Sequence, residues 1–191
     1  MADILSLADA RQALRLPSTD TSNDADLSAT YIPAVTTVVE DITGPIMTRT
    51  GLTFTCDGGQ QTVVLPTACT AVTAVTETGT TLVANVDYVV NTRSGIVMRG
   101  TPTAPFIFLS GQQNITVTYS VGYAAASTNV AANVKTAARI ILAQMFQADQ
   151  QGARTAFGYP DTDTVTTPAG FAVPKRAFEM LRATQNVPGF A

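Results

Sequence analysis

The stretch ITVTYSVGYAAASTNVAANVKTAARIILAQMF, residues 115–146, contains the change of hydrophobic period that decides the fold. In its first part, apolar residues alternate with threonine and serine, which is typical of a half-buried strand with Ile115, Val117, Tyr119 and Val121 on one face. After Gly122-Tyr123 the apolar residues recur at helical spacing, at Val130, Val134, Ala137, Ala138, Ile141, Leu142, Met145 and Phe146. The stretch therefore predicts a strand, a turn and a long amphipathic helix, where a β-rich segment ends and a helical frame resumes.

A short helix is predicted near the N-terminus. Ser6 is followed three residues later by Asp9, which is the spacing of a capping box. The apolar face of this helix consists of Leu7, Ala10 and Leu14. We expect the helix to stop before Pro17.

A second helix is predicted to begin at Asn23 or Asp24 and to end at Gly44, which Pro45 follows. Its apolar stripe consists of Leu27, Tyr31, Ala34, Val35, Val38 and Ile42. Pro33 lies within this stripe and has no backbone amide hydrogen, so we expect it to kink the helix or to delay its effective start.

Residues 46–123 are predicted to form β-structure, because valine and threonine are frequent and turn residues recur at short intervals. A short strand is predicted at Val63–Leu65, before Pro66. The predicted hairpins join strands 69–76 and 81–84 through residues 77–80, and strands 86–90 and 96–99 through residues 91–95.

Residues 151–173 are rich in glycine, threonine, proline and aspartate, which predicts a loop. A connection of this length without its own structure is usually functional or disordered. A final helix is predicted to open at Pro174, because proline is favoured in the first turn. We expect Phe178 and Leu181 to point inward on this helix, and the outward side chains to be Lys175, Arg176 and Arg182.

These elements together predict an α+β protein, in which a small helical frame holds an inserted antiparallel β domain. The frame comprises two N-terminal helices, one long later helix and one C-terminal helix. The expected parts are an N-terminal helical part at 1–45, a β-rich insert at 46–123, the long helix at 124–150, and a flexible loop with the C-terminal helix at 151–191.

Charge is scarce and unevenly distributed in this chain. Charged residues make up 13% of the sequence, well below the usual quarter or so. The net charge of −3 divides into −5 for residues 1–44, zero for 45–124 and +2 for 125–191. With only two lysines, the chain has no basic stripe that would grip nucleic-acid phosphates. A surface so poor in charge suits packing against further copies.

The cysteine and histidine counts limit the chemistry that the chain can perform. Cys56 and Cys69 both fall in predicted strands, and reduced, buried thiols are the favoured interpretation, although a disulfide between paired strands stays open. There is no histidine, no C-x-x-C pair and no phosphate-binding glycine motif. We therefore expect no catalytic residue, no cofactor and no metal site.

Two acidic clusters are interpreted as caps and turns. The alternating polar residues at 20–26 resemble the start of a calcium loop, but Ala25 and Tyr31 stand where such a loop needs glycine and glutamate. Asp161 and Asp163 have no catalytic partner nearby, which favours an exposed turn.

No targeting or membrane-spanning segment is recognised. The N-terminus, MADILSLADARQ, lacks the basic and apolar regions of a signal peptide. Lys135, Arg139 and several glutamines interrupt the long helix, so it is unsuited to a bilayer. We expect a soluble protein that is made in the cytoplasm and has no membrane contact.

The side chains expected to contact a partner lie in the last forty or so residues. Aromatic residues in the loop either pack back onto their own domain or anchor a neighbour, and both alternatives stay open. The basic face of the final helix is either solvated or meets an acidic partner. The candidate contact residues are Phe157, Tyr159, Phe171, Lys175, Arg176, Phe178, Leu181 and Arg182.

Several short motifs occur in a distinctive order. They are DARQALRLP (9–17), DADLSATYIPAVTTVVEDITG (24–44), VTYSVGY (117–123) and NVKTAARIILAQMF (133–146), with the β insert after the second. In this order they resemble the head-to-tail adaptor proteins of long-tailed bacteriophages, also called head-completion or connector proteins. The resemblance covers most of residues 6–150, and it departs at Pro33 and at Asn133, near which the family often has a proline.

The resemblance implies a structural protein of the virion neck, at the head–tail junction. Such proteins form a ring, commonly of about twelve copies, between the portal protein and the next neck, stopper or tail protein. DNA would pass through the ring without specific binding, and the protein would perform no chemistry. The C-terminal segment often supplies the portal contact in this family, which agrees with the candidate residues given above.

The alternative function is a β-rich tail-tip or carbohydrate-recognition module of a virion. The threonine-rich insert is compatible with this function. The absence of tryptophan argues against it, since sugar-binding platforms usually need aromatic faces. Binding of glycans by the isolated insert would favour this alternative.

Overall fold

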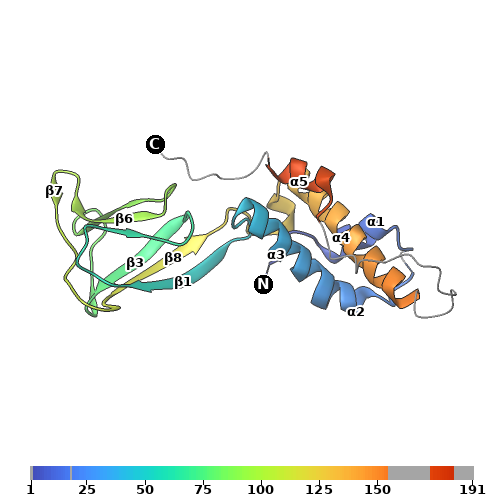
Figure 1. Ribbon diagram of the computed structural model, residues 1–191, viewed down its shortest axis with the longest axis horizontal. Helices are drawn as coiled ribbons and strands as arrows, with labels where there is room; N and C mark the ends of the chain where they lie inside the picture. Colours follow the sequence, from blue (N-terminus) through green and yellow to red (C-terminus); the bar gives the residue numbers. More distant parts are fainter. Residues whose placement is uncertain (1, 18, 155–172, 183–191) are drawn as a thin grey trace, which may run out of the picture. The chain divides into compact units, whose positions relative to one another are not determined.

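The computed structural model describes residues 2–17, 19–154 and 173–182, and these divide into two compact units. The described residues before Pro45 and those between 126 and 182 form a helical unit, whereas Pro45–Ala125 form a β unit (Figure 1). The β unit is inserted between the second helical region and the long helix. The α+β class with four helical regions and antiparallel sheets, predicted from the sequence, is confirmed.

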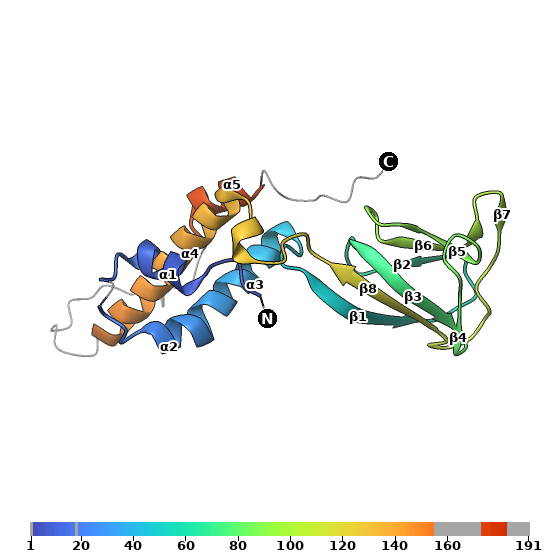
Figure 2. The same cartoon turned by 180° about the vertical axis from the view of Figure 1, so that it is seen from behind.

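The helical unit contains the four predicted helices, and the second of them is divided. The elements are α1 (Leu7–Leu14), α2 (Asp24–Asp26), a π-helical turn η1 (Leu27–Tyr31), α3 (Ile32–Thr43), the 3-10 turn η2 (Ser127–Asn129), α4 (Ala132–Arg154) and α5 (Lys175–Arg182). Helix α4 contacts α1, α3 and α5, and it is therefore the central element of the unit (Figure 2).

Helix α1 begins and ends as the sequence predicts. The Ser6 hydroxyl accepts a hydrogen bond from the Asp9 amide at 3.1 Å, and Asp9 Oδ2 accepts one from the Ser6 amide at 3.2 Å. Both halves of the capping box are therefore formed. At the other end, Arg15 adopts a left-handed conformation, and the chain leaves the helix before Pro17.

Pro33 delays the start of the regular helix. Because proline has no amide hydrogen, the normal helical bond at its position is lost. The preceding residues form a π turn, in which the Ile32 amide bonds to the Leu27 carbonyl, and the α-helical ladder resumes from Ile32 to Thr43. Gly44 ends α3 at a φ of 87°, as predicted.

The core of the helical unit is built on one face of α4. Val134, Ala137, Ala138, Ile141 and Leu142 are each fully buried, which confirms the predicted stripe. The residues that pack in this core from the other helices and the N-terminal segment are Ile4, Leu5, Ala10, Leu27, Ile32, Val35, Val39, Ala177 and Leu181. The buried Thr36 hydroxyl accepts a hydrogen bond from the Ile4 amide at 3.2 Å and so attaches the N-terminal segment to α3.

Tyr31 connects the π turn to the later part of α4. Its ring meets Phe146 edge to face at a centroid distance of 5.5 Å, and its hydroxyl donates to Asp149 Oδ2 at 2.7 Å. The hydrogen bond to Asp149, together with partial burial and the Asp149 and Asp26 charges, raises the pKa of Tyr31 to about 12.

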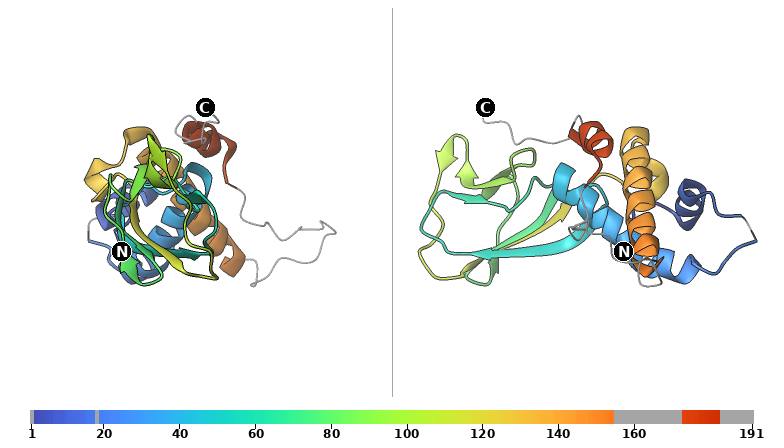
Figure 3. Two further views of the ribbon diagram at one scale, coloured as in Figure 1. Left: turned by 90° about the vertical axis from the view of Figure 1, so that its left-hand side faces the viewer. Right: turned by 45° about the vertical axis from the view of Figure 1, so that its right-hand side comes forward.

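The β unit contains two antiparallel sheets, drawn in cyan to yellow in Figure 3. Its strands are β1 (Arg49–Cys56), β2 (Thr62–Val64), β3 (Ala71–Glu77), β4 (Thr80–Thr81), β5 (Tyr88–Asn91), β6 (Ile96–Thr101), β7 (Ala104–Pro105) and β8 (Ile115–Val121). One sheet has the order β1-β8-β3-β4; the other has the order β2-β6-β5, with β7 also paired to β6. The inner faces share one core, with alternate residues of β8 fully or nearly fully buried.

The predicted hairpins are confirmed with small shifts in their bounds. Thr78 and Gly79, both with positive φ, form a two-residue turn between β3 and β4, and a second hairpin joins β5 to β6. The prediction that both cysteines lie in strands is wrong for Cys69, which follows the bend after Pro66. Both cysteines are free thiols, and burial raises the pKa of each.

The two ends of the β unit meet. The Thr48 amide donates to the Ala124 carbonyl, and the Tyr123 and Ala124 amides both donate to the Ile46 carbonyl, each at 2.9 Å. Gly122 has a φ of 76°, and a Cβ there would lie 2.2 Å from the Met47 carbonyl oxygen. Glycine is required at this position because any side chain would separate the entering and leaving strands.

Candidate interaction surface

The C-terminal helix α5 is the first candidate surface. It begins directly after Pro174, whose carbonyl accepts the Phe178 amide at 3.0 Å. Ala177 and Leu181, one turn apart, are fully buried where α5 contacts α3 and α4. Lys175, Arg176 and Arg182 are exposed, as predicted.

The prediction for the aromatic residue of α5 is wrong. Phe178 was expected to point inward, but its side chain is 41% exposed. The small Ala177 occupies the buried position instead, because it lies one helical turn from Leu181, whereas Phe178 is rotated by about 100° from Ala177. Phe178 is therefore available to a partner, while Leu181 is committed to the packing of its own unit.

The remaining predicted contact residues cannot be placed in the same way. Phe157, Tyr159 and Phe171 lie outside the described residues.

On α5 itself, Lys175 and Glu179 are 3.9 Å apart with side chains 91% and 64% exposed. An ion pair so exposed contributes little to stability and leaves both charges available for new partners.

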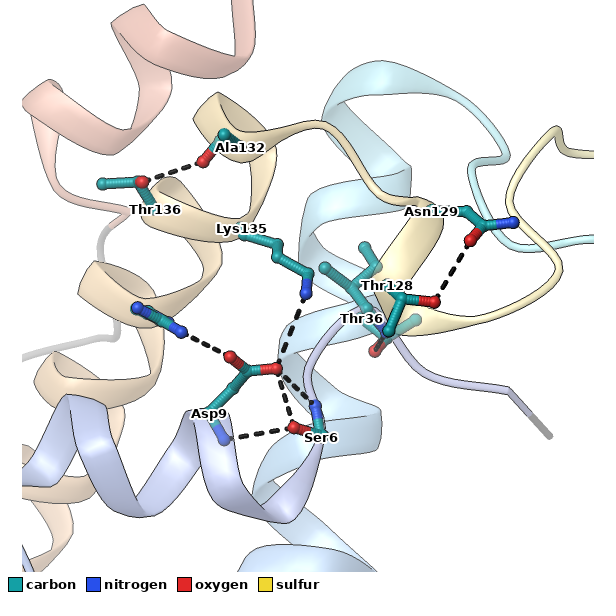
Figure 4. A network of polar contacts seen from close by, with 10 residues as sticks. Ser6, Asp9, Thr36, Thr128, Asn129, Ala132, Lys135 and Thr136 are labelled. Atoms are coloured by element: carbon teal, nitrogen blue, oxygen red, sulfur yellow. Dashed lines mark hydrogen bonds and ion pairs between the residues drawn. The ribbon is translucent and has the colours of Figure 1, made fainter.

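A polar network around Asp9 fixes α1 on α4 (Figure 4). Asp9 accepts from the Ser6 hydroxyl at 2.7 Å, from the Arg139 guanidinium, and forms an ion pair with Lys135 at 3.7 Å. Partial burial raises the pKa of Asp9, but the hydrogen bonds from Ser6 and Arg139 and the Lys135 charge outweigh it and lower the pKa to about 2. Sequence reasoning missed this network because its members lie some 130 residues apart.

The alternating polar residues at 20–26 have structural partners. Asp20 accepts from the Ser22 hydroxyl at 2.6 Å, and this bond lowers the pKa of Asp20. Asp24 forms an ion pair with Arg11 at 3.1 Å. Among the residues that the structure describes, no group of three or more acidic, cysteine or histidine side chains could hold a metal ion.

The second candidate surface is the segment from Phe106 to Leu109, between β7 and β8. Phe106, Ile107 and Leu109 are 59%, 67% and 61% exposed, whereas Phe108 is buried. Successive side chains of an extended chain point to opposite faces, so Ile107 and Leu109 point away from the core that holds Phe108. The buried Phe108 side chain therefore fixes a segment whose neighbouring apolar side chains are exposed to solvent. The sequence did not predict this feature.

A buried carboxylate holds this segment in place. Glu77, whose side chain is only 6% exposed, accepts the Leu109 amide at 2.7 Å and an Arg99 N–H at 3.3 Å. Arg99 also donates to the Asp87 carbonyl at 2.5 Å and lies 3.7 Å from the Asp87 carboxylate. We refer to Glu77, Arg99 and Asp87 as the clasp.

None of the described helices is long and apolar enough to cross a bilayer.

Comparison with protein families decides the identity of the chain. A family model described as head completion protein matches residues 3–187. The chain belongs to the head completion protein family. The resemblance found in the sequence is thereby confirmed, and this head completion protein is a structural component of the virion. Comparison with curated proteins gave no match.

Solved structures share the fold of this head completion protein. A chain in the neck of an empty gene transfer agent particle, computed with C6 symmetry, aligns with a TM-score of 0.62 and 18% identity, over 95% of this chain and 89% of the other. A chain in the native gene transfer agent virion aligns at 0.60 and 16%, with the same coverage. A chain in the native neck, computed with C12 symmetry, aligns at 0.57 and 14%, over 92% and 87%.

Proposed function

We propose that this head completion protein is a head-to-tail adaptor, which forms a ring in the virion neck between the portal protein and the next neck, stopper or tail protein. The family match across residues 3–187 carries this proposal. The shared fold with neck chains from particles analysed with sixfold and twelvefold symmetry supports a cyclic arrangement of about twelve copies.

The charge distribution supports a channel through which DNA slides. The β unit has no net charge over residues 45–124, and the chain as a whole has a net charge of −3. A duplex is held by clustered lysine and arginine side chains that replace its counterions. A ring without such clusters lengthens the DNA channel and binds no particular sequence. In this role the protein performs no chemistry.

Helix α5 and its flanking residues are proposed to contact the portal or a neighbouring copy. Lys175, Arg176 and Arg182 give the helix an exposed cationic face, and the exposed Phe178 ring adds an apolar anchor. Phe157, Tyr159 and Phe171 remain part of this proposal as residues outside the described ranges. Leu181 supports the contact indirectly, by holding α5 on α4.

Truncation in the producing host tests this function. A chain that ends before Pro174 should leave filled heads without attached tails, because the proposed contact is lost. A matched double variant, Phe178→Ala with Arg182→Ala, should reduce attachment without removing the helix. Electron microscopy of purified particles measures the fraction of tailed heads. Full tail attachment by both altered proteins would refute the role of α5, and absence of the protein from purified necks would refute the adaptor function.

A further inference from the structure

Exposed apolar side chains gather at one end of the β unit. Five of the large exposed apolar residues among the described ranges belong to two connections, 82–87 and 106–114: Val83, Val86, Phe106, Ile107 and Leu109. The strand register identifies this end of the sheet. Cys56 at the end of β1 and Glu77 at the end of β3 both pair with Ile115, the first residue of β8. The connections of the unit at Met47 and Ala124 lie at the opposite end of β1 and β8. We call this region the apolar end.

The apolar end is held in one conformation by backbone hydrogen bonds. The Phe106 amide donates to the Arg99 carbonyl at 3.1 Å, and the Phe108 amide donates to the Gln60 carbonyl at 2.9 Å. The Leu109 carbonyl accepts from the Asn114 side chain at 2.7 Å. A surface fixed in this way loses little conformational entropy when a partner binds.

The clasp ties the two connections of the apolar end to each other. The Glu77 carboxylate accepts a hydrogen bond from the Leu109 amide, and the Arg99 guanidinium donates to Glu77. Arg99 also contacts Asp87, whose Oδ2 accepts a hydrogen bond from the Val83 amide at 2.9 Å. A single chain of contacts therefore runs from Leu109 to Val83. Within the clasp the Arg99 guanidinium faces two carboxylates, those of Glu77 and Asp87, and residues 100–134 contain no charged residue.

We propose that the apolar end packs against the β unit of a neighbouring copy of this chain. Rigid apolar side chains on exposed loops mark an interaction site, and a surface without net charge favours self-association, because identical charged surfaces repel. The β unit is neutral, whereas residues 1–44 carry a net charge of −5 that opposes contact between copies through the N-terminal helices. The inference rests on the ring of the proposed function and identifies one of its copy-to-copy contacts.

Sedimentation of the full chain over a range of concentrations tests this contact. The variant Val86→Lys with Ile107→Lys adds one charge to each connection of the apolar end, at side chains 63% and 67% exposed, so the fold should be retained. The control, Thr53→Lys with Thr55→Lys, adds the same charge at exposed polar positions of β1, outside the two connections. We expect the variant to self-associate at least tenfold more weakly than both the wild type and the control.

Equal self-association of the variant and the wild type would overturn the inference. So would a wild-type chain that stays monomeric up to about 1 mM, because a contact weaker than this cannot define a neighbour in a ring. Tail attachment in the producing host separates this inference from the proposed function. Weaker self-association together with tailless particles supports both the contact and the adaptor ring. Weaker self-association with normally tailed particles would show that the ring does not use this contact and would overturn the inference alone, because the adaptor function is tested by the presence of the protein in purified necks. Unchanged self-association with tailless particles would assign the apolar end to a different neck protein and would also overturn the inference.

Discussion

The helical unit and the β unit use charge in different ways. In the helical unit, ion pairs at partly exposed positions join helices that are distant in sequence, as Asp9 joins Lys135 and Arg139. In the β unit, the clasp around the buried Glu77 ties the connections together, and the surface has little charge. Water screens the first kind of pair more strongly than the second. Stability of the helical unit should therefore respond to pH, and that of the β unit to the loss of single buried groups.

The largest effect is expected from Phe108→Ala in the β unit. The side chain is 1% exposed, and its removal leaves a cavity that costs about 3–5 kcal/mol of unfolding free energy. The matched control is Phe106→Ala, two residues earlier and 59% exposed, which should cost less than about 1 kcal/mol. Urea unfolding followed by circular dichroism measures both. Equal losses for the two variants would mean that Phe108 does not anchor the segment.

Truncation of Glu77 should have the next largest effect. Glu77→Ala removes the nearer and more buried of the two carboxylates that face the Arg99 guanidinium, which is 17% exposed, and should cost about 3 kcal/mol. Glu77→Gln keeps an oxygen acceptor for the Leu109 amide and should retain part of this stability. Hydrogen exchange should show faster exchange of the Leu109 amide in the alanine variant than in the glutamine variant. Slow exchange in both would show that the clasp does not hold this connection.

The Asp9 network should make the helical unit sensitive to acid. The pKa of Asp9 is about 2 in the folded protein, whereas its ordinary value, expected in the unfolded chain, is 3.8. The stabilisation is therefore fully present above pH 3.8 and is lost as the pH falls through about 2. This difference corresponds to about 2 kcal/mol. Asp9→Asn should remove that stabilisation at neutral pH and flatten the acid limb of the stability curve. Asp41→Asn, at an exposed position, is the control and should change neither.

The smallest effect is expected from Tyr31→Phe, which removes the hydrogen bond to Asp149 and should cost about 1 kcal/mol. Because the pKa of Tyr31 is raised from 10.0 to about 12, the contribution of this bond is present below pH 10 and is lost as the pH rises through about 12. Spectroscopic titration of the tyrosines should lose its highest step in the variant. An unchanged titration curve would place that step on another tyrosine.

The sequence predicts the elements whose signals are local. The capping box of Ser6 and Asp9, the stop at Gly44, the alternation of β8 and the stripe of α4 each depend on residues a few positions apart. The delay caused by Pro33 is predictable for the same reason, because a missing amide acts within one turn.

The features that periodicity could not predict depend on residues distant in sequence. Phe178 points outward because α3 and α4 accept the small Ala177 at the contact, and the sequence of α5 alone does not contain this information. The clasp joins three separate parts of the β unit, and Cys69 leaves its predicted strand because β3 begins only at Ala71. Pairing of this kind is determined by tertiary structure.

The meeting of the two ends of the β unit has an evolutionary consequence. Since Met47 and Ala124 pair with each other, the chain enters and leaves the unit at one place, and the path between the helices does not depend on what lies in between. A gene with this organisation can exchange, lengthen or lose residues 45–125 as a cassette while the helices keep their own core. Insertions and deletions within residues 45–125 should therefore leave the core of the helical unit intact.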